Sequence, residues 1–177
     1  MLDTKLIIVF GVSGVGKTTA CAEYANRNHD VIHSSASDLL RLHRETAGMR
    51  TIDEVMQDQH TLVDLVCALR AETRASLVLL DAHSLIVVAG RKIVIPADII
   101  AAMNPSGLIF FKATGDVVFS RRALRGDITN IAPQEIERWQ EKSLRAAQSY
   151  ASQIPCRLSV LDVSQGTDLA GAIGSLS

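Results

Sequence analysis

"FGVSGVGKTT", residues 10–19, follows a short apolar run and precedes a helical pattern. The spacing G-x-x-x-x-G-K-[ST] is satisfied by Gly11, Gly16, Lys17 and Thr18. The motif has its meaning in this strand–loop–helix context, because glycines let backbone N–H groups fold around phosphates while the helix adds its positive end. A plain glycine turn would explain the glycines but not the lysine and threonine. We therefore predict an ATP-binding loop made of Gly11, Val12, Ser13, Gly14, Val15, Gly16, Lys17, Thr18 and Thr19.

Two residues of this loop and one distant aspartate are expected to handle the phosphates and a magnesium ion. Lys17 should bridge the β and γ phosphates, and Thr18 should give its hydroxyl to Mg²⁺. The run LVLLDAH ends in Asp81, at the sheet edge where the loop also lies if the two strands are parallel neighbours. A Walker B-type carboxylate holds magnesium there, although aspartate is also a common turn residue at strand ends. His83 would touch an acceptor substrate or bond a loop carbonyl, and taken alone the second interpretation is favoured.

Strand-like and helix-like patterns alternate along the chain. Continuous apolar runs, typical of parallel strands covered on both faces, occupy 5–10, 76–81, 107–113 and 156–163, with a weaker run at 30–35. Apolar positions with a helical period predict one helix over 52–69 and another that begins near Pro133. This alternation predicts a three-layer α/β fold. Two segments depart from it: 85–96 predicts a small hairpin or excursion, and 125–133 predicts a mobile surface loop.

Length and composition limit the classes of protein that fit. A chain of 177 residues fits one compact domain, so residues 1–177 are expected to form a single unit. With 18 Lys and Arg against 19 Asp and Glu, the net charge of −1 gives no case for a general nucleic-acid or anionic-membrane binder. Three scattered cysteines support neither a disulfide framework nor a zinc site. No apolar run is long enough to span a bilayer, and we expect a cytoplasmic protein.

Arginines are the side chains that phosphoryl transfer needs most, because the reaction spreads negative charge over the moving group. In SASDLLR, Ser35 precedes a short helix whose first turns carry Arg41, which can then point back towards a ligand. Arg121 and Arg125 share one helix face at i and i+4, and Arg138 lies on the helix after the loop. Arg121 and Arg125 could instead belong to a solvated basic face, and glutamates near Arg138 could neutralise part of its helix face and leave it as plain surface.

The order of these motifs resembles the nucleoside monophosphate kinases, most closely the archaeal-type adenylate kinases. The resemblance covers nearly the whole chain and rests on the loop, SASDLLR, DAHS, MNPSGLIFF and GDVVFSRR. It implies a P-loop kinase fold with a five-stranded parallel sheet flanked by helices, acceptor-binding helices at about 35–74 and a lid at about 125–133. It further implies that Arg41 grips the acceptor phosphate, that Arg121 and Arg125 flank the ATP base and phosphates, and that Asp81 and His83 face the reaction site.

The resemblance implies Mg²⁺-dependent transfer of the ATP γ-phosphoryl group to a nucleoside monophosphate, with AMP the leading acceptor. Two segments depart from the family pattern: DITNIAP contains no arginine where the lid usually has one, and 85–96 has no confident match to an acceptor-base segment. These departures keep two alternatives open. One is a kinase for a sugar, a shikimate-like alcohol or another small metabolite, and the other is a slow ATPase that serves as a nucleotide-dependent binding protein.

Overall fold

One parallel sheet forms the centre of the molecule. The computed structural model describes residues 4–43, 51–88, 90–127, 131–164 and 166–176. Five strands pair in parallel in the order β2-β3-β1-β6-β7. Their bounds are β1 Lys5–Phe10, β2 Val31–Ser35, β3 Leu77–Asp81, β6 Gly107–Lys112 and β7 Arg157–Asp162. The predicted five-stranded parallel sheet is confirmed, and the weak run at 30–35 forms its edge strand.

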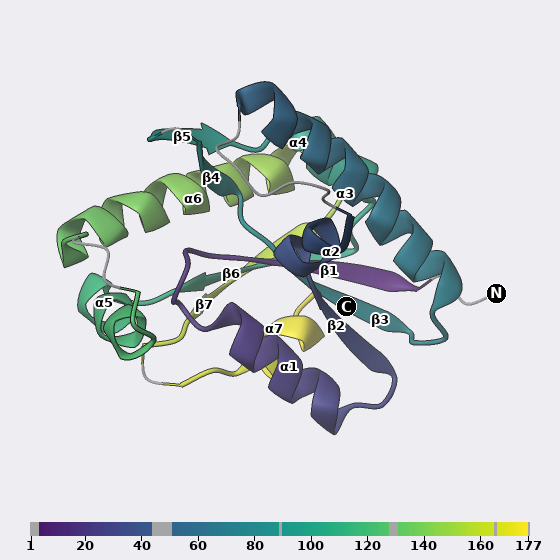
Figure 1. Ribbon diagram of the computed structural model, residues 1–177. Helices are drawn as coiled ribbons and strands as arrows, with labels where there is room; N and C mark the ends of the chain where they lie inside the picture. Colours follow the sequence, from purple (N-terminus) through teal and green to yellow (C-terminus); the bar gives the residue numbers. More distant parts are fainter. Residues whose placement is uncertain (1–3, 44–50, 89, 128–130, 165, 177) are drawn as a thin grey trace.

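Two helical layers cover the sheet (Figure 1). On one face lie α2 Ala36–His43, α3 Ile52–Glu72, α4 Ala97–Ala102 and α6 Pro133–Gln153. On the other lie α1 Lys17–Arg27, α5 Gly115–Leu124 and α7 Leu169–Gly174. Successive strand side chains point to opposite faces, so Leu6 and Ile8 join the first core while Ile7 and Val9 join the second. Strands that are buried on both faces therefore read as continuous apolar runs.

Local signals in the sequence place the long helices and the hairpin. The helix expected over 52–69 is α3, which starts with a capping box: the Thr51 hydroxyl accepts the Glu54 N–H, and the Glu54 carboxylate accepts the Thr51 N–H. The second predicted helix begins at Pro133 as α6. Residues 85–96 hold an antiparallel hairpin of β4 Leu85–Val88 and β5 Arg91–Val94. None of the helices in the described ranges is long and apolar enough to cross a membrane.

Buried hydrogen bonds hold α6 against the strand ends. The Gln140 amide donates to the carbonyl of Ala113 at 2.7 Å and accepts its N–H at 3.0 Å, just after β6. Ser84, which follows β3, donates to the Ser143 carbonyl at 3.1 Å, and the two hydroxyl oxygens lie 2.6 Å apart. These buried bonds fasten α6 to the residues that follow two different strands. The middle of α6 is thereby fixed as a wall beside the carboxyl edge of the sheet.

Candidate active site at the carboxyl edge of the sheet

The glycine-rich loop follows β1, the central strand of the sheet. Strands β2 and β3 lie on one side of β1 and strands β6 and β7 on the other, so the strand order reverses at β1. Strand β1 ends at Phe10, and α1 begins at Lys17 directly after the loop. Gly14 has φ +86°, a backbone conformation that residues with side chains rarely adopt. A Cβ there would also lie 2.5 Å from Cγ of Arg122, so any other residue would be strained and would have to displace that side chain. Crevices at such reversals, outside the carboxyl ends of parallel strands, are where open α/β sheets bind ligands. The fold thus sets the loop at a binding position.

Lys17 is buried although it carries a charge. Its side chain is 5% exposed, and Nζ donates to the carbonyls of Gly11 at 2.8 Å and Val12 at 3.3 Å. One carboxylate oxygen of Asp81 lies 3.7 Å from Nζ. Burial lowers the pKa of the Lys17 ammonium below its ordinary value, and the Asp81 carboxylate opposes that effect. The ammonium is therefore held at the loop by oxygen acceptors that phosphate oxygens could replace.

Thr18 and Asp81 bring two oxygen donors together beside the loop. The Thr18 hydroxyl donates to one carboxylate oxygen of Asp81. Strands β1 and β3 are adjacent and parallel, with Val9 opposite Asp81. The loop and the start of α1, which carries Thr18, follow β1, so Thr18 and Asp81 meet at the same edge of the sheet. Mg²⁺ prefers oxygen ligands and is commonly held by one or two carboxylates together with substrate phosphates and water. The hydroxyl and the carboxylate fit that ligand chemistry, so Thr18 and Asp81 are the residues that would hold the ion.

His83 contributes a neutral ring next to the loop. Its Nδ1 lies 3.0 Å from the carbonyl oxygen of Gly11, an acceptor, so Nδ1 carries the proton. His83 keeps an exposed side, yet desolvation by the groups around its ring and, next, the Lys17 charge together lower its pKa from 6.5 to about 4, against the Asp81 charge and the hydrogen bond to Gly11. The ring is therefore neutral at pH 7. In that tautomer Nε2 keeps its lone pair and can accept a hydrogen bond from a substrate.

A cavity of about 210 Å³ gathers most of the predicted site residues. Of these, it is lined by Ser13, Gly14, Gly16, Lys17, Thr18, Ser35, Asp81, His83 and Arg125. The sequence analysis missed Ser37, another lining residue, whose hydroxyl lies 2.8 Å from that of Ser35. The polar walls and the buried ammonium suit an anion such as the phosphates of a nucleotide. We refer to this space as the phosphate cavity.

Other predicted site residues lie outside the phosphate cavity. The Arg41 side chain is 77% exposed and bonds the Asp38 carboxylate at 3.0 Å. The Arg138 side chain is 76% exposed and lies 3.5 Å from a carboxylate oxygen of Glu135. Neither arginine is among the described residues that line the cavities near the loop. Helical spacing showed which face each arginine occupies, but not how far its guanidinium reaches.

The remaining loop predictions involve the backbone more than side chains. Val12 and Val15 bury their side chains in the core, so any contact they make with phosphate must come from the main chain. Thr19 is exposed on α1 and does not line the phosphate cavity. Arg121 donates to the carbonyls of Val15 at 2.6 Å and Val163 at 3.1 Å. Arg121 therefore stabilises the loop by a hydrogen bond to its backbone at Val15. The predicted lid at 125–133 lies partly outside the described residues.

A second cavity, of about 220 Å³, adjoins the first. The two share Ser13 and His83 among their lining residues, so they meet above the loop. We call the second space the hairpin cavity, because β4 and α6 form its outer walls. Those walls include Leu85, Ile86, Val87, Trp139 and Ser143. The sequence analysis assigned none of them to a site, although the hairpin and the only tryptophan of the chain were both visible signals.

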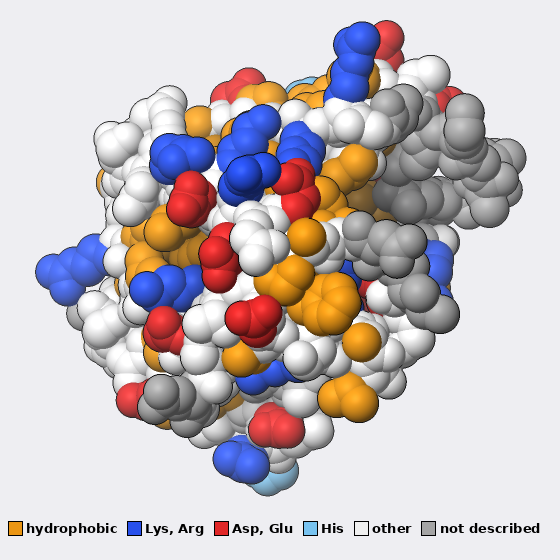
Figure 2. All heavy atoms as spheres, turned by 90° about the vertical axis from the view of Figure 1, so that its left-hand side faces the viewer, with side chains coloured by type: hydrophobic (Ala, Val, Ile, Leu, Met, Phe, Trp, Pro, Cys, Tyr) orange, Lys and Arg blue, Asp and Glu red, His pale blue; other side chains and the backbone are white. Residues whose placement is uncertain are grey.

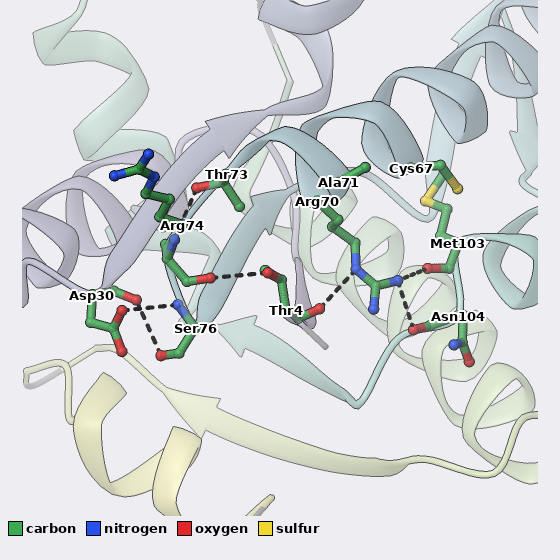
Figure 3. Close-up of a pocket in the computed structure, with 11 residues that line it drawn as sticks. Thr4, Asp30, Cys67, Arg70, Ala71, Thr73, Arg74, Ser76, Met103 and Asn104 are labelled. Atoms are coloured by element: carbon green, nitrogen blue, oxygen red, sulfur yellow. Dashed lines mark hydrogen bonds between the residues drawn. The ribbon is translucent and has the colours of Figure 1, made fainter. Parts of the chain in front are cut away.

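A larger cavity, of about 850 Å³, lies at the opposite edge of the sheet. Figure 3 shows Arg70 reaching from α3 towards the start of β1, where it donates to the carbonyls of Thr4 at 2.9 Å and Met103 at 3.0 Å. These bonds tie α3 and the end of α4 to the amino end of the sheet. None of the predicted phosphate-binding residues is among the described residues that line it. Size alone therefore does not select the functional cavity.

Figure 2 looks onto the end of the molecule that forms the left-hand side of Figure 1, where α5 and the start of α6 lie. Basic and acidic side chains alternate there, with hydrophobic side chains between them. The ion pairs in this part of the fold include Arg122 with Asp127 at 2.9 Å and Lys92 with Glu135 at 2.7 Å. A mixed surface of this kind focuses little net charge on a ligand. Lys17 and Arg125 line the phosphate cavity itself and are the positive side chains placed to meet phosphates there.

Comparison with known families assigns the loop and its surroundings. A family model described as an AAA domain matches residues 10–140, which is 131 of the 177 residues. The chain belongs to this family. The match begins at the last residue of β1 and includes the loop, Asp81, the hairpin and the start of α6. No curated protein is a significant match to this AAA-domain chain.

Solved structures with the same architecture include several kinases. A gluconokinase from Sinorhizobium meliloti 1021 has a TM-score of 0.58 at 17% identity, over 99% of this chain and 94% of its own. A shikimate kinase from Bacteroides thetaiotaomicron has a TM-score of 0.52 at 16% identity, over 97% and 94%. A sugar kinase from Janibacter sp. HTCC2649 has a TM-score of 0.53 at 17% identity, over 90% and 85%. At these identities the likeness concerns the fold, and the AAA-domain chain has the fold of P-loop kinases.

Proposed function

We propose that this chain is a kinase that transfers the γ-phosphoryl group of ATP, with Mg²⁺, to a hydroxyl group of a small metabolite. The observation that carries the proposal is the junction of the two cavities at Ser13 and His83. A nucleotide whose phosphates fill the phosphate cavity would have its terminal group next to whatever occupies the hairpin cavity. A donor site that adjoins a second small cavity suits a two-substrate transfer better than a nucleotide switch.

In the proposed reaction the protein supplies charge and alignment. Lys17 exchanges its loop carbonyls for phosphate oxygens, and backbone N–H groups of the loop hold the same oxygens. Mg²⁺, held by Thr18 and Asp81, would supply further neutralisation of the phosphates. The acceptor oxygen forms its bond to the γ-phosphorus while the bond from that phosphorus to the bridging oxygen of ADP breaks. The neutral Nε2 of His83 accepts a hydrogen bond from the acceptor hydroxyl and orients its oxygen towards the γ-phosphorus, and the hydroxyl proton passes to water as the new O–P bond forms.

The acceptor is the part of the proposal with two candidates. Three proteins of similar fold, a gluconokinase, a sugar kinase and a shikimate kinase, favour a small metabolite. The motif order and the position of Arg41 on α2 favour a nucleoside monophosphate such as AMP, as in adenylate kinases. Against AMP, Arg41 bonds Asp38 and lines neither cavity near the loop, so the acceptor phosphate would lack its expected partner unless α2 moved. We therefore place the small metabolite first.

An acceptor screen tests the proposal. Purified protein with Mg²⁺ and ATP is incubated with AMP and other monophosphates, with gluconate and shikimate, and with uncharged alcohols, while ADP and phosphorylated product are both followed. Product that accumulates in step with ADP for one acceptor class supports the kinase. ADP release at one slow rate, whether or not an acceptor is present, would instead favour the slow ATPase and reject the transferase.

Arg41→Ala separates the two acceptor candidates. If AMP is the acceptor, loss of this guanidinium should raise the KM for AMP by about tenfold or more, while the KM for ATP changes little. For a small-metabolite kinase, both constants should stay near those of the original chain. Arg74→Ala removes an arginine that lines the large cavity at the opposite edge and serves as the matched control.

A further inference from the structure

The walls of the hairpin cavity are mainly apolar. Leu85, Ile86 and Val87 come from β4, and Trp139 comes from the second turn of α6 (Figure 1). The volume of about 220 Å³ lies below the range of roughly 300–1,000 Å³ that drug-sized ligands occupy. An occupant of this space must be small, and most of its surface must be apolar to match these walls.

The described lining of this cavity carries no formal charge. Its polar side chains are those of Ser13, Ser143 and His83, and no Lys, Arg, Asp or Glu is among the described residues that line it. Ser143 is 2% exposed and already shares its hydroxyl with Ser84. Burying a carboxylate or phosphate against such walls would cost several kcal/mol without a cationic partner. The cavity therefore selects against acceptors that bring a second anionic group.

Trp139 is held in place by an ion pair. Its Nε1 donates to the Glu135 carboxylate at 2.6 Å, and the same carboxylate oxygen lies 2.7 Å from Nζ of Lys92 on β5. The Lys92 ammonium lies 4.3 Å from the centre of the Trp139 ring. Glu135 thus joins the ring to Lys92 and fixes it between hairpin and helix, while its other carboxylate oxygen lies 3.5 Å from the exposed Arg138. A fixed aromatic surface favours a ligand with a ring or a branched hydrocarbon body.

We infer that the hairpin cavity binds an uncharged alcohol with a mainly apolar body, and that this alcohol is the phosphoryl acceptor. The inference rests on the proposed kinase function for the transfer step, but its binding part is independent of that step. The hydroxyl lies towards His83 and Ser13, where the two cavities meet, and the hydrocarbon body lies against Trp139 and β4. Gluconate and shikimate carry a carboxylate besides the accepting hydroxyl, and AMP presents a phosphate in place of that hydroxyl, so all three fit these walls poorly.

Matched pairs of alcohols isolate the effect of charge. Benzyl alcohol is compared with 4-(hydroxymethyl)benzoate, and cyclohexylmethanol with 4-(hydroxymethyl)cyclohexanecarboxylate. Trp139 is the only tryptophan of the chain, so its fluorescence reports directly on the cavity. Each compound is titrated into the full chain that holds Mg²⁺ and a non-hydrolysable ATP analogue. We expect each uncharged alcohol to bind about tenfold or more tightly than its carboxylate partner.

A lysine added to the wall should reverse that preference. Val87 lines the cavity and is 52% exposed, so Val87→Lys is compatible with folding and adds one ammonium beside the ligand. The carboxylate partners should gain affinity relative to the alcohols by about tenfold. Val94→Lys puts the same charge on the other hairpin strand, at a residue that is 37% exposed and lines neither cavity near the loop. That control should leave the preference unchanged.

Product analysis by phosphorus NMR completes the test with the same compounds, AMP, gluconate and shikimate. Phosphorylation of the uncharged alcohols in preference to their carboxylate partners supports the inference. Phosphorylation of anionic acceptors alone would overturn it and leave the kinase proposal standing. If the alcohols bind selectively but ADP release stays independent of them, the kinase proposal fails while the binding class stands. Equal binding of both members of each pair, or an unchanged preference in Val87→Lys, would also overturn it.

Discussion

Lys17 shows how one residue reconciles burial with charge at the glycine-rich loop. Its ammonium is desolvated, yet it has the carbonyls of Gly11 and Val12 and the carboxylate of Asp81 as acceptors. The polar partners come from the loop itself and from the neighbouring strand, so the site exists before any ligand binds. A charge held ready in this way needs little reorganisation when phosphates arrive.

Replacing Lys17 with methionine tests that arrangement. The hydrocarbon stem stays and the charge is lost, so phosphoryl transfer should fall by about a hundredfold or more, since one preorganised donor is worth that much. Rates of ADP release and product formation measure the loss. Circular dichroism should show an unchanged fold. Full activity in a folded Lys17→Met chain would contradict the role of the loop.

His83 makes stability depend on pH in a direction that can be worked out. Its pKa is about 4 in the folded chain and 6.5 for the ordinary group, so the unfolded chain binds the proton more readily between these values. Lowering the pH from 6.5 to 4 therefore favours unfolding. His83→Gln removes this contribution, and its stability should fall less steeply over that range. His33, whose pKa is also lowered by burial, remains in both proteins.

Urea unfolding of both chains at several pH values between 4 and 8 measures the difference. Because carboxylates and His33 titrate in both proteins, only the difference between the two curves belongs to His83. That difference should be constant above pH 7 and change as the pH falls below 6.5. Parallel curves over the whole range would show that the ring does not lose a proton on folding.

Among the secondary-structure elements, α6 helps to determine the shape of the hairpin cavity. One face packs against the sheet through Ala146, Ala147 and Tyr150. Gln140 and Ser143 meanwhile satisfy buried polar groups that follow β6 and β3. Trp139 lies beside these bonds, so its position in the hairpin cavity depends on them. Loss of these hydrogen bonds should therefore alter the hairpin cavity by shifting α6.

Gln140→Ala would leave the buried N–H and carbonyl of Ala113 without their partner. Such orphaned groups cost about 1–3 kcal/mol each, so we expect the free energy of unfolding to fall by about 2 kcal/mol or more. Denaturant unfolding measures the change. Gln148→Ala makes the same substitution at an exposed position of the same helix and should change stability by less than about 0.5 kcal/mol. Similar losses of unfolding free energy in both variants would mean that the hydrogen bonds of Gln140 contribute little to stability.

At the scale of the whole molecule, the sequence predicted the parts that depend on neighbouring residues. The five strands are visible in the sequence as apolar runs, so the sheet was predictable. The residues of the glycine-rich loop are consecutive in the sequence, so the position of the loop was predictable as well. The meeting of Thr18 with Asp81 needed one further assumption, that β1 and β3 are neighbours, and the structure has that pairing. Adjacent parallel strands bring their carboxyl ends to one edge, which made the assumption a reasonable one.

The hairpin cavity could not be predicted because tertiary packing creates it. Ile86 and Trp139 lie far apart in the sequence and meet only because the hairpin packs beside α6. A hydrophobic residue in a hairpin has the same pattern whether it lines a cavity or fills a core. Likewise, the spacing of Arg41 and Arg138 gives their helix faces but not the ion pairs with Asp38 and Glu135 that hold them in solvent.

Ligand binding should distinguish the two edges of the sheet. At a concentration one hundred times its Kd, a Mg²⁺-bound, non-hydrolysable ATP analogue stabilises the folded chain by about 2.7 kcal/mol. For a chain of this size that corresponds to a rise in Tm of roughly 5–11 °C. Hydrogen exchange should slow in residues 11–19 and around Asp81, and stay unchanged around the large cavity at residues 70–76, because no predicted phosphate-binding residue lines it.

Two variants locate the effect. Lys17→Met should abolish both the rise in Tm and the slowed exchange, whereas Arg74→Ala, at the edge of the large cavity, should retain both. Protection centred on residues 70–76, or a Tm shift lost in Arg74→Ala and kept in Lys17→Met, would move the nucleotide to the opposite edge. The cavity volumes alone would favour that edge, since 850 Å³ exceeds 210 Å³. The glycine loop, the buried ammonium and the paired oxygens of Thr18 and Asp81 favour the smaller space, because charge and geometry, more than volume, bind phosphates.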